Sequence, residues 1–317
     1  MLGLIESIRF KLLKSTHVKS KKSIFLFFYS RGLPWDKGFN LSTTAEEINE
    51  KLRPYFIKVV SHNKQTLKEI QGSEHFCNEF SKTLDKNPNA NNFGYFDFKP
   101  FLINHELQSL KSDETLVYHD GNFIRNAQYW ESDWQNIDLI TNYLMTRNRS
   151  SIWVQFEGYG NLVKHHVKEQ TLNFFFNSKE KNLVKKSHLI NAARVIVKND
   201  EFGREFIGNY KKYCEDKNVI FNDELSLQDE EFLWSCGDQD VLNCLVYRNI
   251  LDGNLGVLFP RFAFFYRIIE FSRRNIIFHS DTEKRQVKTG IYPLYNFNLI
   301  LYVVSHRILK LIKSEKF

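Results

Sequence analysis

Residues 93–122 decide the fold, and they read FGYFDFKPFLINHELQSLKSDETLVYHDGN. Apolar residues in the first half recur at spacings of three and four, which predicts a helix: Leu102, Ile103, Leu107 and Leu110. A β-favouring apolar run at residues 115–118 follows, and it ends at Asp120-Gly121-Asn122. A carboxylate at the carboxyl end of a buried strand lies where open α/β sheets bind ligands. We therefore expect a helix, a buried strand and a ligand-facing turn.

Segments typical of strands and helices alternate along the rest of the chain. Predicted strands occupy residues 23–29, 56–60, 151–156, 189–197, 255–259 and 275–278. Predicted helices begin near residue 42 or occupy residues 65–70, 130–145, 168–173, 202–215 and 238–249. This alternation predicts an α/β fold with a Rossmann-like, mostly parallel central sheet flanked by helices.

The composition indicates a globular protein with reduced cysteines. Of the 317 residues, 42% are hydrophobic and 26% are charged. No window reaches the roughly 18 apolar residues that a membrane-spanning helix needs. No CxxC pair occurs among the cysteines, which are Cys77, Cys214, Cys236 and Cys244. The N-terminus also lacks a cleavable signal sequence, so we expect a cytoplasmic protein with free thiols.

Much of the excess positive charge, a net +7, lies at the two ends of the chain. Residues 1–22 and 286–317 combine basic residues with apolar residues at helical spacing, as amphipathic helices on anionic membranes do. We therefore expect a basic N-terminal segment, a catalytic domain at residues 23–285 and a basic C-terminal segment. The terminal segments either contact the inner surface of the plasma membrane or pack on the domain as ordinary surface helices.

Two acidic clusters are candidates for chemistry. Asp120 and Asn122 offer oxygen atoms that suit a divalent cation or a ribose, although this tripeptide is also a common turn. Asp238 and Asp240 begin a predicted helix, where they either cap it or accept a proton from a sugar hydroxyl. His279 follows a late predicted strand, and it is either a metal ligand or polar surface.

The order of these motifs carries a resemblance to a known family. Gly94-Tyr95 and Lys99-Pro100 precede Tyr118-x-Asp120-x-Asn122, and Asp238-Gln239-Asp240-x-x-Asn243 follows much later. This order resembles the GT-A glycosyltransferases of bacterial surface-polysaccharide synthesis, in which a Gly-Tyr-Trp-x-Trp-Lys-Pro segment precedes a Tyr-x-Asp-x-Gly/Asp strand end. The later segment is similar to one in the glycogenin and lipooligosaccharide galactosyltransferase group. The resemblance spans residues 23–284.

The resemblance implies a GT-A type fold and a set of roles. Asp120 would contact the nucleotide ribose and Mn²⁺ or Mg²⁺, and the other metal ligands would be Asn122 and His279. Asn122 stands where many relatives have a second acid, so the metal requirement stays open. Asp238 or Asp240 would be the base of an inverting reaction, whereas a retaining reaction needs none. The remaining contacts to the nucleotide sugar would come from Tyr29, Ser30, Arg31, Lys99, Tyr118, Gln239 and Lys284.

We therefore predict a glycosyltransferase that moves a sugar from a nucleotide-sugar donor to a lipid-linked or lipopolysaccharide O-antigen glycan. The expected donor is a UDP-hexose, with galactose in pyranose or furanose form as one example. Two other classes remain. A catalytically inactive, membrane-associated scaffold that binds nucleotide sugars would explain Asn122. A nucleic-acid-binding protein would explain the charge and the 15% aromatic content, but no zinc-ligand or other nucleic-acid-binding motif accompanies them.

Overall fold

The computed structural model describes residues 23–28, 44–74, 76, 97–112, 114–120, 151–156, 161–216, 219, 228–233, 235, 237–252 and 254. The chain divides into two compact units, and nearly all described residues belong to one of them, Lys19–Glu157 with Asn161–Arg248. The other unit comprises Met1–Val18, Gly158–Gly160 and Asn249–Phe317. Its described part is the end of one helix together with Asn254.

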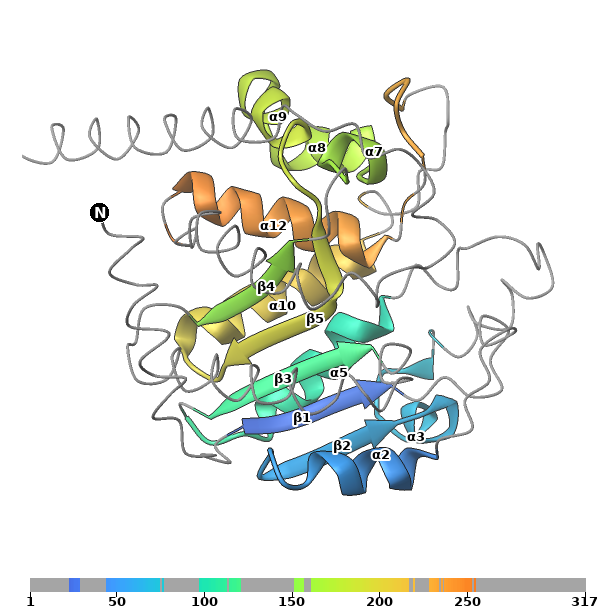
Figure 1. The fold of residues 1–317 in the computed structure, drawn as a ribbon. Coiled ribbons are helices and arrows are strands. Elements are labelled where there is room, and N and C mark those ends of the chain that lie inside the picture. Colours follow the sequence, from blue (N-terminus) through green and yellow to red (C-terminus); the bar gives the residue numbers. More distant parts are fainter. Residues whose placement is uncertain are drawn as a thin grey trace, which may run out of the picture. The chain divides into compact units, whose positions relative to one another are not determined.

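Five strands form one mixed sheet (Figure 1). They are β1 (Ser23–Phe28), β2 (Lys58–His62), β3 (Thr115–Asp120), β4 (Ile152–Phe156) and β5 (Ile190–Lys198), in the spatial order β2-β1-β3-β5-β4. β1 pairs in parallel with β2 and β3, whereas β5 is antiparallel to both β3 and β4. Phe28 is in register with Asp120, so the carboxyl ends of β1 and β3 lie side by side.

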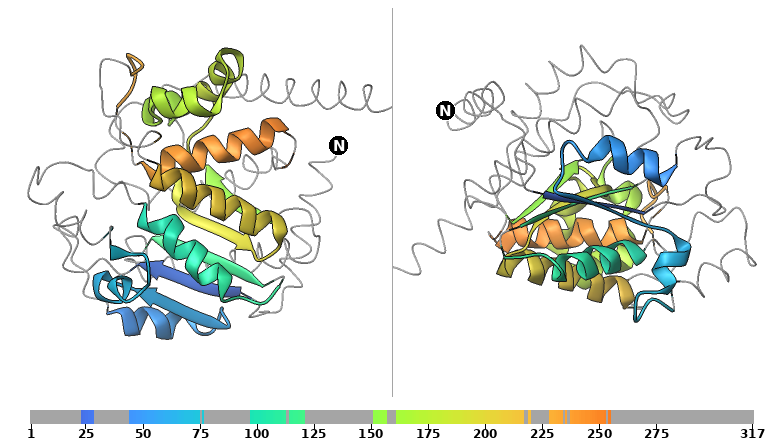
Figure 2. Two further views of the ribbon diagram at one scale, coloured as in Figure 1. Left: turned by 180° about the vertical axis from the view of Figure 1, so that it is seen from behind. Right: turned by 90° about the horizontal axis from the view of Figure 1, so that it is seen from below.

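Helices cover both faces of the sheet (Figure 2). α2 (Ala45–Leu52) lies on one face, and α5 (Phe98–Gln108), α10 (Glu201–Glu215) and α12 (Asp238–Asp252) lie on the other. Side chains of β3 alternate between the two faces. Val117 packs with residues of α2, whereas Asp120 contacts a lysine of α5. The end of β3 thus directs its carboxylate toward the three-helix side.

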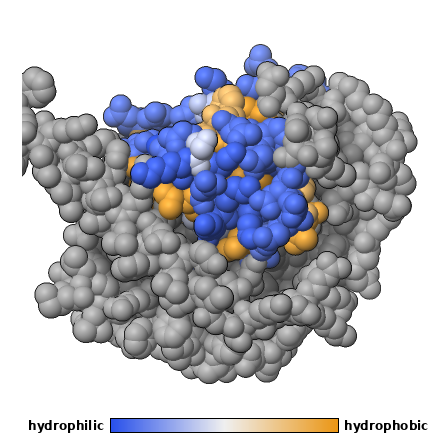
Figure 3. Space-filling model, turned by 90° about the horizontal axis from the view of Figure 1, so that it is seen from above, coloured by the Kyte–Doolittle hydropathy of each residue, from blue (hydrophilic) through white to orange (hydrophobic). Residues whose placement is uncertain are grey.

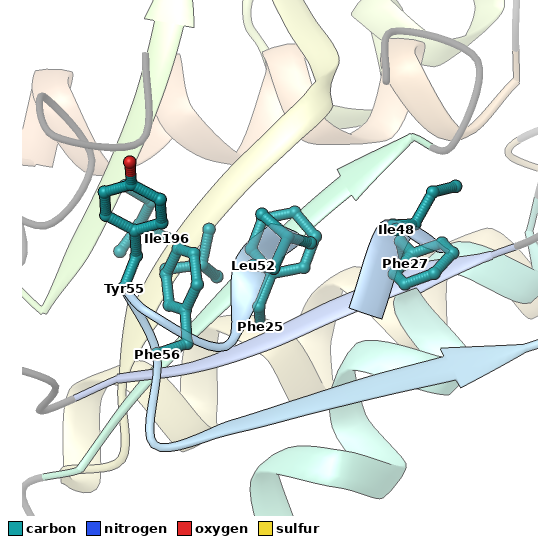
Figure 4. Packing of buried hydrophobic residues seen from close by; sticks show 8 residues of the cluster. Phe25, Phe27, Ile48, Leu52, Tyr55, Phe56 and Ile196 are labelled. Atoms are coloured by element: carbon teal, nitrogen blue, oxygen red, sulfur yellow. The ribbon is translucent and has the colours of Figure 1, made fainter. Parts of the chain in front are cut away.

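An aromatic core fills the space between α2 and the sheet (Figure 4). The rings of Phe25 and Phe56 lie with their centroids 4.9 Å apart, and both are buried. Burying one such side chain contributes about 1.5–3 kcal/mol to folding. The cluster consists of Phe25, Phe27, Ile48, Leu52, Tyr55, Phe56, Val117 and Ile196.

Short helices form a separate, more polar layer. They are α7 (Val163–His166), α8 (Glu169–Phe175) and α9 (Ser178–Lys185), and α3 (Lys64–Lys68) follows β2 elsewhere. The Glu169 carboxylate pairs with Lys181 at 2.5 Å and with Lys185 at 3.1 Å, and Lys185 also pairs with Asp229 at 2.6 Å. Seen from above, the described surface is mainly hydrophilic with smaller apolar areas (Figure 3).

The expected α/β architecture with helices flanking a central sheet is confirmed, but the sheet is mixed rather than mostly parallel, because β5 runs antiparallel to both of its neighbours. α2 begins with the capping box that its sequence predicts, in which Thr44 and Glu47 each accept the other's main-chain N–H. β2 begins at Lys58 rather than at residue 56, and Phe56 packs in the core just before the strand. Leu110 is buried but lies beyond the end of α5. The sequence patterns did not indicate α7 or α9.

Several sequence predictions fall outside the described residues. They concern the helix at 130–145, the strands at 255–259 and 275–278, and the basic segments at 1–22 and 286–317. The domain boundaries at residues 23 and 285 likewise remain predictions. Among the helices that the structure describes, none is long and apolar enough to cross a membrane. Cys214 and Cys244 are buried free thiols, as the composition predicts.

Candidate functional site

Three charged side chains meet at the carboxyl end of β3. Lys99 Nζ lies 3.1 Å from Asp120 Oδ2 and 3.3 Å from Asp238 Oδ2. The residues come from three elements: α5 and β3 follow one another in the chain, whereas α12 comes more than 100 residues later. All three were candidate site residues, and the fold brings them together. We call them the Lys99 cluster.

β3 places two members of the site on one face. Tyr118 and Asp120 are two residues apart in an extended strand, so their side chains point the same way. The Tyr118 hydroxyl donates to Asp120 Oδ1 at 2.8 Å. Burial, reinforced by the Asp120 charge, raises the pKa of Tyr118 well above its ordinary value. The phenol therefore remains a donor that fixes the orientation of the Asp120 carboxylate.

The position of Lys99 is electrostatically costly unless anions balance it. The residue lies in the first turn of α5, where the helix dipole disfavours a cation, and its side chain is only 8% exposed. Burial alone would also favour the neutral amine. The two carboxylates offset both effects. The neighbouring Pro100 is tolerated here because the first turn of a helix needs no N–H donor from it.

Asp238 is the most deeply buried member of the cluster. Its side chain has no exposed surface, and Oδ2 accepts from Lys99 and, at 3.3 Å, from the Tyr210 hydroxyl. No donor among the described residues contacts Oδ1. Burial raises the pKa of the Asp238 carboxyl to about 7, and the nearby Asp120 adds to this rise while Lys99 opposes it. The carboxylate therefore gains and loses its proton near neutral pH.

The rest of the predicted Asp238–Asn243 motif faces the main chain of other elements. Asp240 Oδ2 accepts from the Lys168 N–H at 3.0 Å and from the Ser235 hydroxyl at 2.9 Å. Asn243 both accepts from Ile190 N–H and donates to Ile190 O. The Gln239 amide donates to the same carbonyl at 2.9 Å. These residues join α12 to the start of β5 and to the approach to α8, rather than to Lys99.

On the opposite face of the sheet, a buried histidine supports the end of β3. His119 Nδ1 lies 2.9 Å from the carbonyl of Asp120, and its Nε2 lies 3.0 Å from Arg194 Nη2. Burial, aided by the Arg194 charge, lowers the pKa of His119 to about 3. The neutral ring therefore donates to the Asp120 carbonyl and accepts from arginine. This pair holds the backbone beneath the Lys99 cluster.

Sequence reasoning missed Tyr210, His119 and Arg194. No local pattern marks Tyr210, which lies on α10 and contacts Asp238 of α12 only in the folded protein. His119 and Arg194 become neighbours through the register of β3 with β5, which the sequence does not specify. The other predicted contacts lie outside the described residues: Tyr29, Ser30, Arg31, Asn122, His279 and Lys284.

The described residues are a poor match to a divalent metal site. No group of three or more acidic, histidine or cysteine side chains among them is placed to hold an ion. Of the three expected metal ligands, Asp120 is the one that lies among the described residues. Its two carboxylate oxygens accept from Lys99 and from Tyr118. Mg²⁺ and Mn²⁺ prefer several oxygen ligands, and here an ammonium lies between the available carboxylates.

No protein-family model, curated protein sequence or solved structure matches this chain.

Proposed function

We propose that this protein is a glycosyltransferase that uses a nucleotide-sugar donor. The observation that carries the proposal is the convergence of Lys99, Asp120 and Asp238 at the carboxyl end of β3. The same residues carry the resemblance to GT-A glycosyltransferases, and they are scattered through the sequence. Their meeting in one buried cluster is what a shared site would require.

The location of the cluster supports the proposal. Ligands of open α/β sheets bind beyond the carboxyl ends of the strands, commonly where the strand order changes direction. β1 and β3 are adjacent parallel strands, and Asp120 ends the second of them. The predicted nucleotide contacts Tyr29, Ser30 and Arg31 follow directly after β1 in the sequence. A nucleotide bound across these two strand ends would reach Asp120.

Each member of the cluster has a distinct role in this proposal. Asp120 is 19% exposed, so it is the carboxylate that a bound donor can touch. Asp238 is fully buried and acts as a positioning residue through Lys99. Of the two aspartates considered for the base, Asp238 contacts Lys99, whereas Asp240 Oδ2 accepts from the Lys168 N–H and the Ser235 hydroxyl. Because Asp120 is partly exposed, we assign it the contact with the donor. The buried residues Lys99 and Asp238 orient its carboxylate.

The reaction would break the bond between the anomeric carbon and the diphosphate oxygen and form one to an acceptor hydroxyl oxygen. The acceptor proton leaves with solvent or a base, and the nucleoside diphosphate takes the electron pair of the broken bond. A lipid-linked or lipopolysaccharide glycan is the proposed acceptor, because the basic terminal segments would hold the enzyme at an anionic membrane.

A panel of nucleotide sugars tests the proposal. We expect one donor to raise the melting temperature of the wild-type protein, because a ligand that binds only the native state stabilises it. The same donor should release nucleoside diphosphate when a glycolipid acceptor is added. Asp120→Asn should weaken donor binding at least tenfold, whereas Asp252→Asn, at the exposed end of α12, should not.

Other results would identify the competing classes. Donor binding without turnover on any acceptor would favour the inactive scaffold. Salt-sensitive binding of oligonucleotides without nucleotide-sugar binding would favour a nucleic-acid-binding protein. Normal donor binding by Asp120→Asn would refute the assignment of Asp120.

A further inference from the structure

Lys99 occupies the position from which a metal ion would bridge the two carboxylates of the site. Its ammonium contacts Asp120 Oδ2 and Asp238 Oδ2 at 3.1 and 3.3 Å. These two oxygens come from β3 and α12, and both point at the same nitrogen. A protein cation is therefore already placed where negative charge converges.

A divalent ion and this ammonium cannot share the position. Oxygen ligands lie about 2.0–2.6 Å from Mg²⁺ or Ca²⁺, so a bridging ion would overlap the space that Nζ fills. The like charges would also repel strongly at such a distance in a buried site. A metal that bridged these two carboxylates would have to displace Lys99 and would leave a buried ammonium without its partners.

Asp120 retains capacity for a different kind of ligand. An ionised carboxylate offers about four acceptor positions, and the described partners Lys99 and Tyr118 use one on each oxygen. The remaining positions suit hydroxyl donors, such as the vicinal hydroxyls of a ribose or a sugar. Because the side chain is 19% exposed, such a ligand has access.

We infer that Lys99 is the internal cation of the site, and that Asp120 receives donor hydroxyls directly rather than through a divalent metal. This inference rests on the proposed function, and it revises the metal expectation that came with the resemblance. It also assigns Lys99 a specific task, which is to hold the carboxylates of Asp120 and Asp238 together in the place of an ion.

Manganese binding by the full-length protein tests this inference without any sugar donor. Free Mn²⁺ is titrated and followed by electron paramagnetic resonance for the wild type, Asp120→Asn, Lys99→Met and the double variant Lys99→Met/Asp120→Asn. Wild type and Asp120→Asn should bind Mn²⁺ identically. Lys99→Met should gain a site, because two carboxylates then lack their cation, and the double variant should lose it.

The contrary outcomes are distinct. Manganese binding by the wild type that Asp120→Asn abolishes would overturn the inference, and this comparison does not depend on a folded Lys99 variant. A folded Lys99→Met protein that gains no site would overturn it too, because lysine would not be what keeps metal away. If the nucleotide-sugar panel yields no ligand, the proposed function fails while the manganese result still stands.

If a donor is found, chelation provides the second readout. The dissociation constant of the nucleotide-sugar donor should change less than twofold when EDTA is added. A loss of donor binding that Mn²⁺ restores would contradict direct recognition by Asp120. Lys198→Met is the matched control, since Lys198 is also a buried lysine of the sheet but is not a member of the Lys99 cluster.

Discussion

Lys99 illustrates how one buried charge depends on groups from separate elements. It is disfavoured by burial and by the dipole of α5, and it is stable because β3 and α12 each supply a carboxylate. Neither aspartate is close to it in sequence. The native state therefore gains this interaction only when all three elements are assembled.

Removing the cation should destabilise the protein strongly. We expect Lys99→Met to lower the free energy of unfolding by about 3–5 kcal/mol, because it leaves two neighbouring carboxylates without a cation. Lys211→Met should cost less, since Lys211 and its partner Glu215 are both about one-third exposed. Urea denaturation measures both. Adding Asp238→Asn to Lys99→Met should recover part of the loss, and strictly additive effects would show that the residues are not coupled.

Two buried titrating groups should make stability depend on pH with opposite signs. The pKa of Asp238 is raised to about 7 by burial, so between about pH 4 and 7 the folded state binds its proton and the unfolded state does not. The free energy of unfolding therefore falls as pH rises through this window, by roughly 4 kcal/mol. Asp238→Asn should remove this fall, as measured by urea denaturation at several pH values.

His119 should act in the reverse direction. Its pKa is lowered to about 3 by burial and by Arg194, so between about pH 3 and 6.5 the unfolded state binds the proton and the folded state does not. Stability then rises with pH across this range, by roughly 5 kcal/mol. His119→Gln should flatten that rise and leave the contribution of Asp238 exposed. If both variants keep the wild-type profile, the burial of these groups does not control the pH response.

At the scale of elements, α12 contributes a residue to the site and also holds neighbouring segments through hydrogen bonds. Its first residue, Asp238, enters the Lys99 cluster, while Asp240 and Asn243 bind the main chain at Lys168 and Ile190. Gly237 precedes the helix with a φ of 40°, a conformation that favours glycine. These hydrogen bonds fix the start of α12 and thereby keep Asp238 buried beside Lys99.

Helix α10 offers a matched pair of glycines for a test of packing. A Cβ at Gly203 would lie 2.0 Å from the carbonyl oxygen of Lys198, whereas a Cβ at Gly208 would meet no atom within 4 Å. We expect Gly203→Ala to destabilise the protein by about 1–3 kcal/mol or more through overpacking. Gly208→Ala should stabilise it by roughly 0.5–1 kcal/mol, because alanine favours the helix.

Thermal and urea unfolding of the two variants compare the same chemical change in one helix. Equal effects at the two positions would contradict the close approach of α10 to the end of β5.

At the scale of the whole molecule, the charge distribution predicts where the protein acts. The net charge is +7, and the segments predicted to be basic and amphipathic lie at both ends of the sequence. We expect deletion of residues 297–317 to release the protein from anionic liposomes, since the deletion removes three lysines together with the apolar residues between them. Co-sedimentation with anionic and neutral vesicles measures the effect. Unchanged partitioning would instead favour ordinary surface helices.

Local sequence patterns predicted much of the described fold. The apolar run before Asp120 and the Thr44–Glu47 cap identify β3 and α2 because those signals act within a few residues. The direction of β5 could not be predicted, because an apolar strand has the same composition in either orientation. Its pairing depends on contacts with distant strands.

The site was predictable to a similar degree. Lys99, Asp120 and Asp238 were identified as candidates, but their direct contact was not. The separate paths of Asp238 and Asp240 have a simple cause: residues two apart on a helix point in very different directions, so one aspartate faces Lys99 and the other faces Lys168. Sequence alone did not indicate which of the two would face the cluster.

The wide spacing of the Lys99 cluster also has a consequence for synthesis. Domains fold as their chains emerge, with the N-terminal part first. Lys99 and Asp120 leave the ribosome well before Asp238, so the nascent protein holds an incomplete charge cluster until α12 follows. A chain that stops short of α12 therefore carries a buried lysine with half its counter-charge and a β5 that lacks its hydrogen bonds to α12. We therefore expect a chain that terminates before α12 to be less stable than the full chain.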